Sequence, residues 1–413
     1  MPKTVDLVYF NAGGGHRAAA LALQAVIREQ GRPWDVRLVN LTEVLDPTAR
    51  FRKLTGMAPE DLYNKRLASG WTLGLAQELK LLQGMIRIGH DTLLRKLQQH
   101  WLRTEPDLVV SLIPNFNRAL QESVATSLPG VPFVTVLTDM ADHPPNFWIE
   151  RSQRQHLVCA TARAVAQARE AGVADELIHR TSGMILRPDF YRTECVDRAV
   201  ERAAIGLDPL RPTGVVMFGG QGSMQMLRMA QSLRDVQLIL LCGHNQALAG
   251  KLRSMRTLAP HAVVGFTADV GRYMRLGDFF IGKPGPGCLS EAVQCGLPVI
   301  TFLNAWTMPQ ERYNARWVDE QGLGLVLKSA GSLRAAVDQL LHRLPEFRAR
   351  VERVENRAVF EVADILAGLL HAAGTPDVSG AFGAFSAHRV AASGGHAPAL
   401  QPLRAGRSMS RPA

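Results

Sequence analysis

A strand, a glycine turn and a helix follow one another twice in this chain, and this repeated succession constrains the fold more than any other feature. The first copy is the apolar run Val5–Phe10, the glycines of Gly13–Gly15 and an Ala- and Leu-rich helix expected at Arg17–Gln30. The second copy begins with a strand expected at Thr213–Phe218 and continues through the glycines of 219–222. Such a succession opens a doubly wound α/β domain with a parallel sheet.

More short apolar runs follow each copy, as parallel strands alternating with helices require. We expect further strands at 35–40, 107–113, 132–138, 157–160, 179–181, 237–242, 262–264, 278–281 and 298–302. The polar stretch 191–212 reads as a connecting segment. The pattern therefore predicts an α/β protein with two Rossmann-like lobes and a cleft between them. We assign residues 1–188 to an N-terminal lobe, 189–373 to a C-terminal lobe and 374–413 to a flexible tail rich in Gly, Ala, Ser, Pro and Arg.

Composition excludes several classes of protein. Of the 413 residues, 46% are hydrophobic and 20% are charged, which is enough apolar surface for folded domains. No stretch approaches the roughly 18 apolar residues that a membrane span needs. The chain runs from its first residues straight into a strand, so we expect no signal peptide. The five cysteines are odd in number and form no Cys-x-x-Cys pair, which argues against a disulfide scaffold and a zinc ribbon and favours the cytoplasm.

The positive charge concentrates in one apolar segment. The formal net charge is +10, and the segment 47–103 holds ten basic residues against four acidic ones. Among its members are Arg66, Trp71, Lys80 and Arg87. A basic, apolar, Trp-bearing segment is typical of a protein that docks on an anionic membrane, and equally of a helical insertion with a solvated basic face. No signature of nucleic-acid binding accompanies it, so we expect no nucleic-acid partner.

A third glycine loop, Lys283–Gly287, lies between an expected strand and a helix expected to begin near Leu289. Backbone N–H groups at such a position are free to bind an anion, and the helix dipole favours negative charge. Gly287 and Cys288 can therefore present their N–H groups to a diphosphate. Glu291, expected in the first helical turn, either accepts hydrogen bonds from a ribose diol or merely complements the helix dipole. None of the glycine loops is followed by the Gly-Lys-Ser/Thr of a nucleotide-binding Walker loop.

The order of these motifs resembles the nucleotide-sugar glycosyltransferases of the GT-B fold, and most closely the monogalactosyldiacylglycerol synthase family, relatives of the peptidoglycan N-acetylglucosaminyltransferase. The resemblance covers about residues 5–370. The matching residues, in chain order, are Gly13–Ala18, Thr138-Asp139, His143-Pro144, Arg187-Pro188, Cys242–Asn245, Gly265-Phe266, Met274, Asp278, Lys283, Gly285–Gly287, Ser290–Ala292, Gly296–Pro298, Gln310-Glu311 and Asn314.

The resemblance implies a role for each matched position. The backbone of Phe266 would hold the uracil of a UDP-sugar, and Glu291 would bind its ribose. The residues implied around the diphosphate are Gly222, Ser223, Gly287 and Cys288. Gln310 and Glu311 would reach the donor hexose, and Gly14 and Gly15 would face the acceptor together with the basic segment.

His16 would face the anomeric carbon, where inverting transfer needs a base for the acceptor hydroxyl. A histidine titrates near neutral pH and suits this task, although a histidine beside glycines is often only a loop residue. Asp139 either orients or replaces His16 as the base, or caps the turn after its strand. Backbone N–H groups can stabilise the diphosphate without a metal, and the chain has no convincing Asp-x-Asp, so we expect neither a metal nor another cofactor.

Two positions depart from the family pattern. Cys288 stands where the family commonly has Thr, which leaves only a backbone contact to phosphate. Pro309 replaces the usual Gly before Gln310-Glu311 and stiffens that loop, which puts galactose as the donor hexose in question.

The expected function is transfer of galactose or glucose from UDP-galactose or UDP-glucose to diacylglycerol, with inversion, by a cytoplasmic protein attached peripherally to the inner face of the cell membrane. Three alternatives remain open from the sequence. One is another acceptor, such as a polyprenyl-linked sugar, and another is a UDP-sugar epimerase, which should show more carboxylates in the cleft loops. The third is a non-catalytic protein that binds lipid or nucleotide, which the intact set of motif residues argues against.

Overall fold

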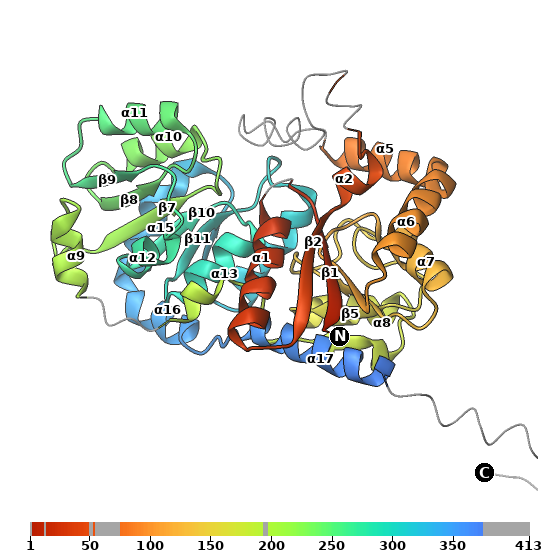
Figure 1. Cartoon of the computed structure of the whole chain (residues 1–413). Coiled ribbons are helices and arrows are strands. Elements are labelled where there is room, and N and C mark those ends of the chain that lie inside the picture. Colours follow the sequence, from red (N-terminus) through yellow and green to blue (C-terminus); the bar gives the residue numbers. More distant parts are fainter. Residues whose placement is uncertain (1, 12–13, 49–52, 54–74, 193–196, 375–413) are drawn as a thin grey trace, which may run out of the picture. The chain divides into compact units, whose positions relative to one another are not determined.

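The computed structural model describes residues 2–11, 14–48, 53, 75–192 and 197–374 (Figure 1). Residues 1–373 form one compact unit. Its described residues form two six-stranded sheets in which every pairing is parallel. The expected fold class is confirmed. The domain boundaries stay a prediction, and the flexible tail lies outside the described residues.

The first sheet has the strand order β2-β1-β3-β4-β5-β6. Its strands are β1 (Lys3–Tyr9), β2 (Trp34–Asn40), β3 (Leu108–Ser111), β4 (Phe133–Val136), β5 (His156–Cys159) and β6 (Ile178–Arg180). Its helices are α1 (Gly15–Glu29), α2 (Leu41–Leu45), α5 (Leu75–Ile88), α6 (His90–Thr104), α7 (Asn117–Ser127) and α8 (Ala162–Glu170). β3 is buried throughout and is a continuous apolar run, whereas the buried centre of β1 also holds Asp6, which pairs with Arg37 at 2.6 Å.

The second sheet has the order β12-β11-β10-β7-β8-β9. Its strands are β7 (Thr213–Met217), β8 (Gln237–Leu241), β9 (His261–Val264), β10 (Phe279–Gly282), β11 (Val299–Phe302) and β12 (Gly324–Leu327). The helices in this part of the chain are α9 (Arg198–Ala204), α10 (Gln225–Ser232), α11 (Gln246–Arg253), α12 (Val270–Arg275), α13 (Pro286–Gln294), α14 (Arg312–Glu320), α15 (Leu333–His342) and α16 (Leu344–Val351). Short 3-10 turns lie at Asp175–Leu177, Pro188–Tyr191, Pro309–Glu311 and Ala330–Ser332.

The last helix, α17 (Ala358–Gly374), returns to the first sheet, beneath which it lies in Figure 1. Its apolar face, with Val359, Val362 and Leu366, belongs to the same buried cluster as Val5 and Leu7 of β1. The core of the first sheet is therefore completed by residues that follow the second sheet in sequence.

The structure corrects three details of the expected secondary structure. The polar segment 191–212, which the sequence predicts to be a connection, contains helix α9. Strand β12 is not among the strands that the sequence predicts. Helix α13 begins at Pro286 instead of near Leu289, with Gly285 at its N-cap. Proline is favoured in the first turn of a helix, because its missing N–H is not needed there.

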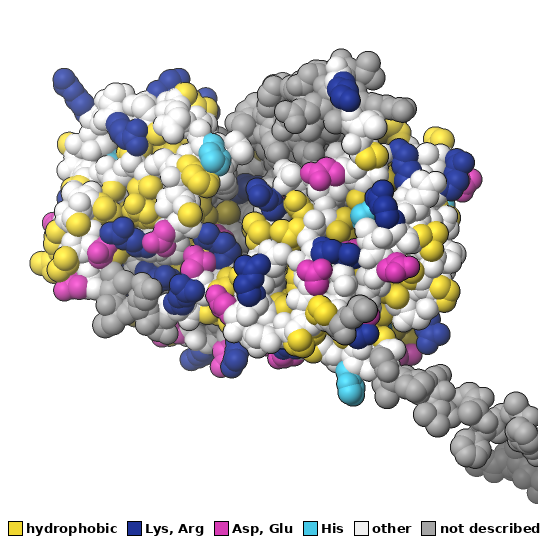
Figure 2. Space-filling view, in the orientation of Figure 1, with side chains coloured by type: hydrophobic (Ala, Val, Ile, Leu, Met, Phe, Trp, Pro, Cys, Tyr) yellow, Lys and Arg dark blue, Asp and Glu magenta, His cyan; other side chains and the backbone are white. Residues whose placement is uncertain are grey.

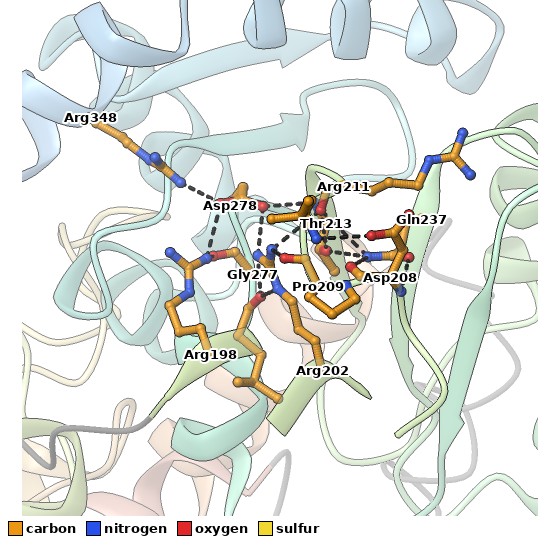
Figure 3. A network of polar contacts seen from close by, with 12 residues as sticks. Arg198, Arg202, Asp208, Pro209, Arg211, Thr213, Gln237, Gly277, Asp278 and Arg348 are labelled. Atoms are coloured by element: carbon orange, nitrogen blue, oxygen red, sulfur yellow. Dashed lines mark hydrogen bonds and ion pairs between the residues drawn. The ribbon is translucent and has the colours of Figure 1, made fainter. Parts of the chain in front are cut away.

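Asp278, directly before β10, explains why α9 forms in so polar a segment (Figure 3). Its carboxylate accepts hydrogen bonds from Arg202 of α9 at 2.7 Å, from Arg198 at 3.0 Å and from the Thr213 backbone N–H at 2.8 Å. Burial alone raises the pKa of Asp278, but the Thr213 N–H and the guanidinium groups outweigh it and lower this pKa. The network joins α9 to the amino-terminal ends of β7 and β10, so its role is structural.

Candidate active site

The strand order places the ligand-binding edge of each sheet. In the first sheet, the chain passes from β1 to β2 on one side and then crosses to β3 on the other side of β1. In the second sheet, the same reversal occurs between β7 and β10. Loops at such a reversal leave in opposite directions from the carboxyl ends of the strands and open a crevice between them. All three glycine loops follow the strands that flank these two reversals.

His16 lies at the first reversal, in the first turn of α1. Its Nδ1 atom is 2.8 Å from the carbonyl oxygen of Leu112, after β3, and 3.1 Å from Thr138 Oγ1, after β4. Because a carbonyl only accepts, Nδ1 carries the proton in this pair and Nε2 keeps a free lone pair. Burial lowers the pKa of His16 to about 4, although the Leu112 carbonyl raises it. The imidazole is therefore neutral at pH 7.

Asp139, the residue after Thr138, is 7% exposed and lies beside the buried Trp148. The indole Nε1–H donates a 3.0 Å hydrogen bond to Asp139 Oδ2, and the indole centroid is 6.1 Å from that of the His16 ring. Burial raises the pKa of Asp139 to about 7, against the lowering effect of the Trp148 hydrogen bond. Trp148 was not identified from the sequence, because its contact with Asp139 spans a loop.

The turn that Asp139 was considered to cap is built by Asp142. The Asp142 carboxylate accepts hydrogen bonds from the backbone N–H groups of Asn146, Phe147 and Trp148, at 2.6 to 2.9 Å. These bonds fold the loop back and bring the indole against Asp139. The carboxylate of Asp139 is thus left with a side-chain partner instead of a capping role.

At the second reversal, the loop 219–223 after β7 packs closely on the loop after β8. Gly222 and Gly243 have positive φ angles of 61° and 56°. A methyl group on Gly243 would lie only 2.1 Å from the Gly220 carbonyl oxygen, and the His244 N–H donates to that oxygen at 2.9 Å. Only glycine fits this crossing of two backbones. The half-buried Ser223 accepts a 3.3 Å hydrogen bond from the Gln225 N–H at the start of α10.

Lys283 and Glu311 join the loop after β10 to the 3-10 turn Pro309–Glu311. Lys283 Nζ lies 2.7 Å from Glu311 Oε1, and Glu311 is 5% exposed. Both groups also act on Asp139. Burial and the Trp148 hydrogen bond have the largest effects on the pKa of Asp139; beyond these, the negative charge of Glu311 raises this pKa and the positive charge of Lys283 lowers it. Asp139 from the first sheet and this ion pair from the second therefore share one electrostatic environment. In the sequence, Lys283 is recognisable only as part of a motif, because Glu311 lies 28 positions away.

The first turn of helix α13 directly follows the loop that holds Lys283. Gly287 is exposed, Cys288 is half-buried, and both lie among the first residues of the helix, whose N–H groups have no partner within it. Burial raises the pKa of the Cys288 thiol to about 12, so the thiol is neutral. Glu291 lies in the second turn of α13, so the expected position in the first turn is wrong. Because the effect of the helix dipole is strongest in the first turn, this position argues against a role of Glu291 that only complements the dipole. Burial raises its pKa to about 7, while Arg187 lowers it.

The remaining site residues occupy neighbouring loops. Phe266, after β9, is 60% exposed, and its ring stacks on that of His244 with centroids 4.0 Å apart. Gln310 is half-buried next to Glu311, and its amide contacts the sulfur of Met308 at 3.8 Å. Gly14, with a φ of 81°, is the N-cap of α1, and Gly15 is the first residue of that helix.

Helix α5 lies within the basic segment 47–103. Its exposed apolar side chains Leu81, Met85 and Ile88 follow one helical face and are 64%, 54% and 90% exposed. Lys80 and Arg87 are exposed beside them, whereas Arg66 and Trp71 lie outside the described residues. Figure 2 shows basic and apolar side chains next to one another at the α5 end of the molecule. Within the described ranges, no helix is long and apolar enough to cross a membrane.

In the same described ranges, no group of three or more His, Cys, Asp or Glu is placed to hold a metal ion. Metal-independent chemistry stays a prediction.

Comparisons with known proteins agree with this architecture. Residues 215–367 match the family model of the glycosyltransferase family 28 C-terminal domain. Among curated proteins, the chain is 28% identical to monogalactosyldiacylglycerol synthase from Spinacia oleracea, over 82% of this chain and 66% of the relative. It is also 28% identical to monogalactosyldiacylglycerol synthase 1 from Arabidopsis thaliana, over 79% of this chain and 63% of the relative. The chain thus spans just under two thirds of the length of these relatives.

Solved structures share the fold at low sequence identity. MurG of Acinetobacter baumannii matches 89% of this chain with a TM-score of 0.57 and 14% identity, and all of that chain is covered. The Arabidopsis thaliana protein UGT89C1, solved with quercetin, matches 90% of this chain and all of its own with a TM-score of 0.57 and 14% identity. The expected resemblance is confirmed: this chain has the GT-B fold, its residues 215–367 match the glycosyltransferase family 28 C-terminal domain, and it is similar to the monogalactosyldiacylglycerol synthases.

Proposed function

We propose that this protein transfers a hexose, galactose or glucose, from a UDP-sugar to diacylglycerol with inversion at the anomeric carbon. The observation that carries the proposal is that Asp139, at the first strand reversal, lies within electrostatic reach of Lys283 and Glu311 at the second. A neutral imidazole with a free Nε2 and the carboxyl of Asp139 belong to the first sheet. The glycine loops, a helix N-terminus and the Lys283–Glu311 pair belong to the second.

The donor would be held by the second sheet. The Phe266 backbone contacts the uracil and Glu291 the ribose, as in the resemblance that the motifs carry. Free N–H groups at the start of α13 and in the loop of Gly222 and Ser223 would bind the diphosphate, because a helix N-terminus attracts anions. Gln310 and Glu311 would accept hydrogen bonds from the hexose hydroxyls. No metal ion or other cofactor takes part in this proposal.

Transfer then needs a base for the acceptor hydroxyl. His16 suits this role, since its Nδ1 is occupied by Leu112 and its Nε2 can take a proton. Asp139 is the second candidate, because its carboxyl is buried and electrostatically coupled to the donor side. Gly14 and Gly15, next to His16, would leave room for the acceptor.

The acceptor is a lipid, so the protein would bind the membrane peripherally, at the cytoplasmic face of the cell membrane. Helix α5 suits this contact, because its apolar stripe can enter the interface while Lys80 and Arg87 meet anionic headgroups. The inner face of the helix is anchored to the domain by Leu79, which packs in a buried cluster, and by Gln83, which donates to Asn115 at 3.0 Å.

The test is an assay with vesicles that contain diacylglycerol, supplied with UDP-galactose or UDP-glucose in competition. We expect release of UDP together with a new glycolipid, and both products roughly 100-fold or more slowly with His16→Ala. Release of UDP only when a polyprenyl-linked sugar replaces diacylglycerol would assign the other acceptor class. Tight UDP binding with no transfer to either acceptor would contradict the proposed enzyme.

A further inference from the structure

The position of Lys283 at the second strand reversal makes it more than the partner of Glu311. A methyl group built on Gly219 would lie 3.6 Å from Lys283 Cε, and one built on Gly285 would lie 3.4 Å from the same atom. The stem of Lys283 therefore passes between the glycine loop after β7 and the one after β10. These are the two loops assigned above to the diphosphate.

The ammonium group is held in place without being buried. Glu311 fixes Nζ at 2.7 Å from one side and is itself almost fully buried, whereas the side chain of Lys283 keeps 32% of its surface exposed. The loop after β10 is also fixed by Asn314, because the buried Asn314 amide donates a 2.9 Å hydrogen bond to the carbonyl of Pro284. The charge of Lys283 reaches both Cys288 in the first turn of α13 and Asp139, since it lowers the pKa of each.

In the proposed reaction, negative charge develops on the diphosphate of the leaving nucleotide. When the bond between the anomeric carbon and the diphosphate oxygen breaks, its electron pair stays on that oxygen and the diphosphate gains a negative charge. A helix N-terminus contributes about half an elementary charge. A positioned ammonium contributes a full charge and an N–H donor. The dipole of α13 alone falls short of the full charge that develops.

We propose that Lys283 is a catalytic residue that donates hydrogen bonds to the diphosphate of the bound nucleotide sugar and stabilises it as the leaving group, with Glu311 as the residue that positions it. The inference rests on the proposed function for its reaction. In the balanced step, the acceptor oxygen bonds to the anomeric carbon as the carbon–diphosphate bond breaks. The acceptor proton passes to the base, and UDP leaves with the electron pair beside the Lys283 ammonium.

Nucleotide binding tests this role separately from transfer. For Lys283→Met we expect the dissociation constant of UDP to rise roughly 10- to 100-fold, the usual effect of losing a hydrogen bond to a charged group. That of uridine, which lacks the diphosphate, should stay unchanged and serves as proof of an intact fold. Raising the salt concentration should weaken UDP binding less in Lys283→Met than in the wild type. Lys283→Arg should retain most of the UDP affinity.

A matched control is Lys251→Met on α11, which removes the same charge from an exposed helix position. It should bind UDP and uridine like the wild type. Equal weakening of UDP and uridine by Lys283→Met would show a structural role and overturn the inference, as would an unchanged UDP affinity. If the wild type binds UDP in this Lys283-dependent manner but transfers no hexose to any lipid, the proposed function fails while the assignment of the diphosphate contact stands.

Discussion

The indole N–H of Trp148 donates a hydrogen bond of 3.0 Å to the carboxylate of Asp139, in a part of the first sheet where both side chains are buried. A hydrogen bond to the charged form of a carboxyl group favours that form. Trp148→Phe removes the donor, so it should raise the pKa of Asp139 above its value of about 7. Carbon-13 NMR titration of the Asp139 carboxyl measures this pKa directly, and an unchanged value would contradict the role of the indole.

His16→Ala should lower kcat by roughly 100-fold or more, the scale expected for loss of a general base, because the variant lacks the Nε2 lone pair that takes the acceptor proton. The dissociation constant of UDP should change little, since His16 belongs to the first sheet. Steady-state kinetics and calorimetry measure the two quantities. An unchanged kcat would remove His16 from the mechanism.

The dependence of kcat on pH separates the two candidate bases. With His16 as the base, kcat should be constant from about pH 5.5 to 8, because a group with a pKa of about 4 is already deprotonated there. A fall in kcat as the pH decreases through about 7 would assign the base to Asp139 instead. The His16→Ala and Asp139→Asn variants, measured over the same range, show which group is responsible.

The free energy of unfolding should also depend on Asp139. Its pKa is raised from 3.8 to about 7 in the folded protein, so the folded state binds the extra proton between these values. Stability therefore falls as the pH rises from about 4 to 7, by roughly 4 kcal/mol at most for this group. Asp139→Asn should make the decrease shallower. Denaturant unfolding at several pH values gives the slope, and identical slopes for both proteins would refute the assignment.

Two acidic side chains on the apolar face of α5 should disrupt membrane docking. Met85→Glu combined with Ile88→Glu removes exposed apolar contacts and adds repulsion from anionic lipid, so vesicle affinity should fall roughly tenfold or more. Leu258→Glu is the control, because Leu258 is 70% exposed and belongs to the second half of the chain. Sedimentation with anionic vesicles measures binding, and equal sedimentation of the double variant and the wild type would exclude α5 as the docking surface.

Gly243→Ala should separate two backbones that now touch. The added methyl group meets the Gly220 carbonyl at 2.1 Å, so the loop of Gly222 and Ser223 must shift and UDP binding should weaken roughly tenfold or more. Gly250→Ala, in α11 with open space around the site, should leave UDP binding unchanged and increase stability by up to about 1 kcal/mol. Calorimetry and thermal unfolding compare the two variants.

The sequence predicted the parts of this fold that depend on local patterns. Buried parallel strands such as β7 and β8 are continuous apolar runs, so their positions could be read within one or two residues. Helix α9 could not be predicted in this way, because its buried Arg202 needs the carboxylate of Asp278 as a partner, and Asp278 lies 76 positions away in the sequence. The start of α13 could have been found from Pro286, since proline favours the first helical turn.

The site divides in the same way. Motifs at the ends of strands identified the glycine loops and His16. The Trp148–Asp139 bond depends on the loop that Asp142 folds, and the Lys283–Glu311 pair joins residues 28 positions apart. Contacts of this kind arise from tertiary structure, so no periodicity or spacing in the sequence predicts them.

The return of α17 to the first sheet bears on how the chain is made. A ribosome releases all six strands of that sheet early, yet Val359, Val362 and Leu366, which cover Val5 and Leu7, emerge only after the whole second sheet. The nascent N-terminal half must therefore keep an apolar face exposed until the second sheet and α17 have been synthesised. A fragment cut at residue 188 should for the same reason precipitate on expression, and adding residues 358–374 as a separate peptide should restore its solubility.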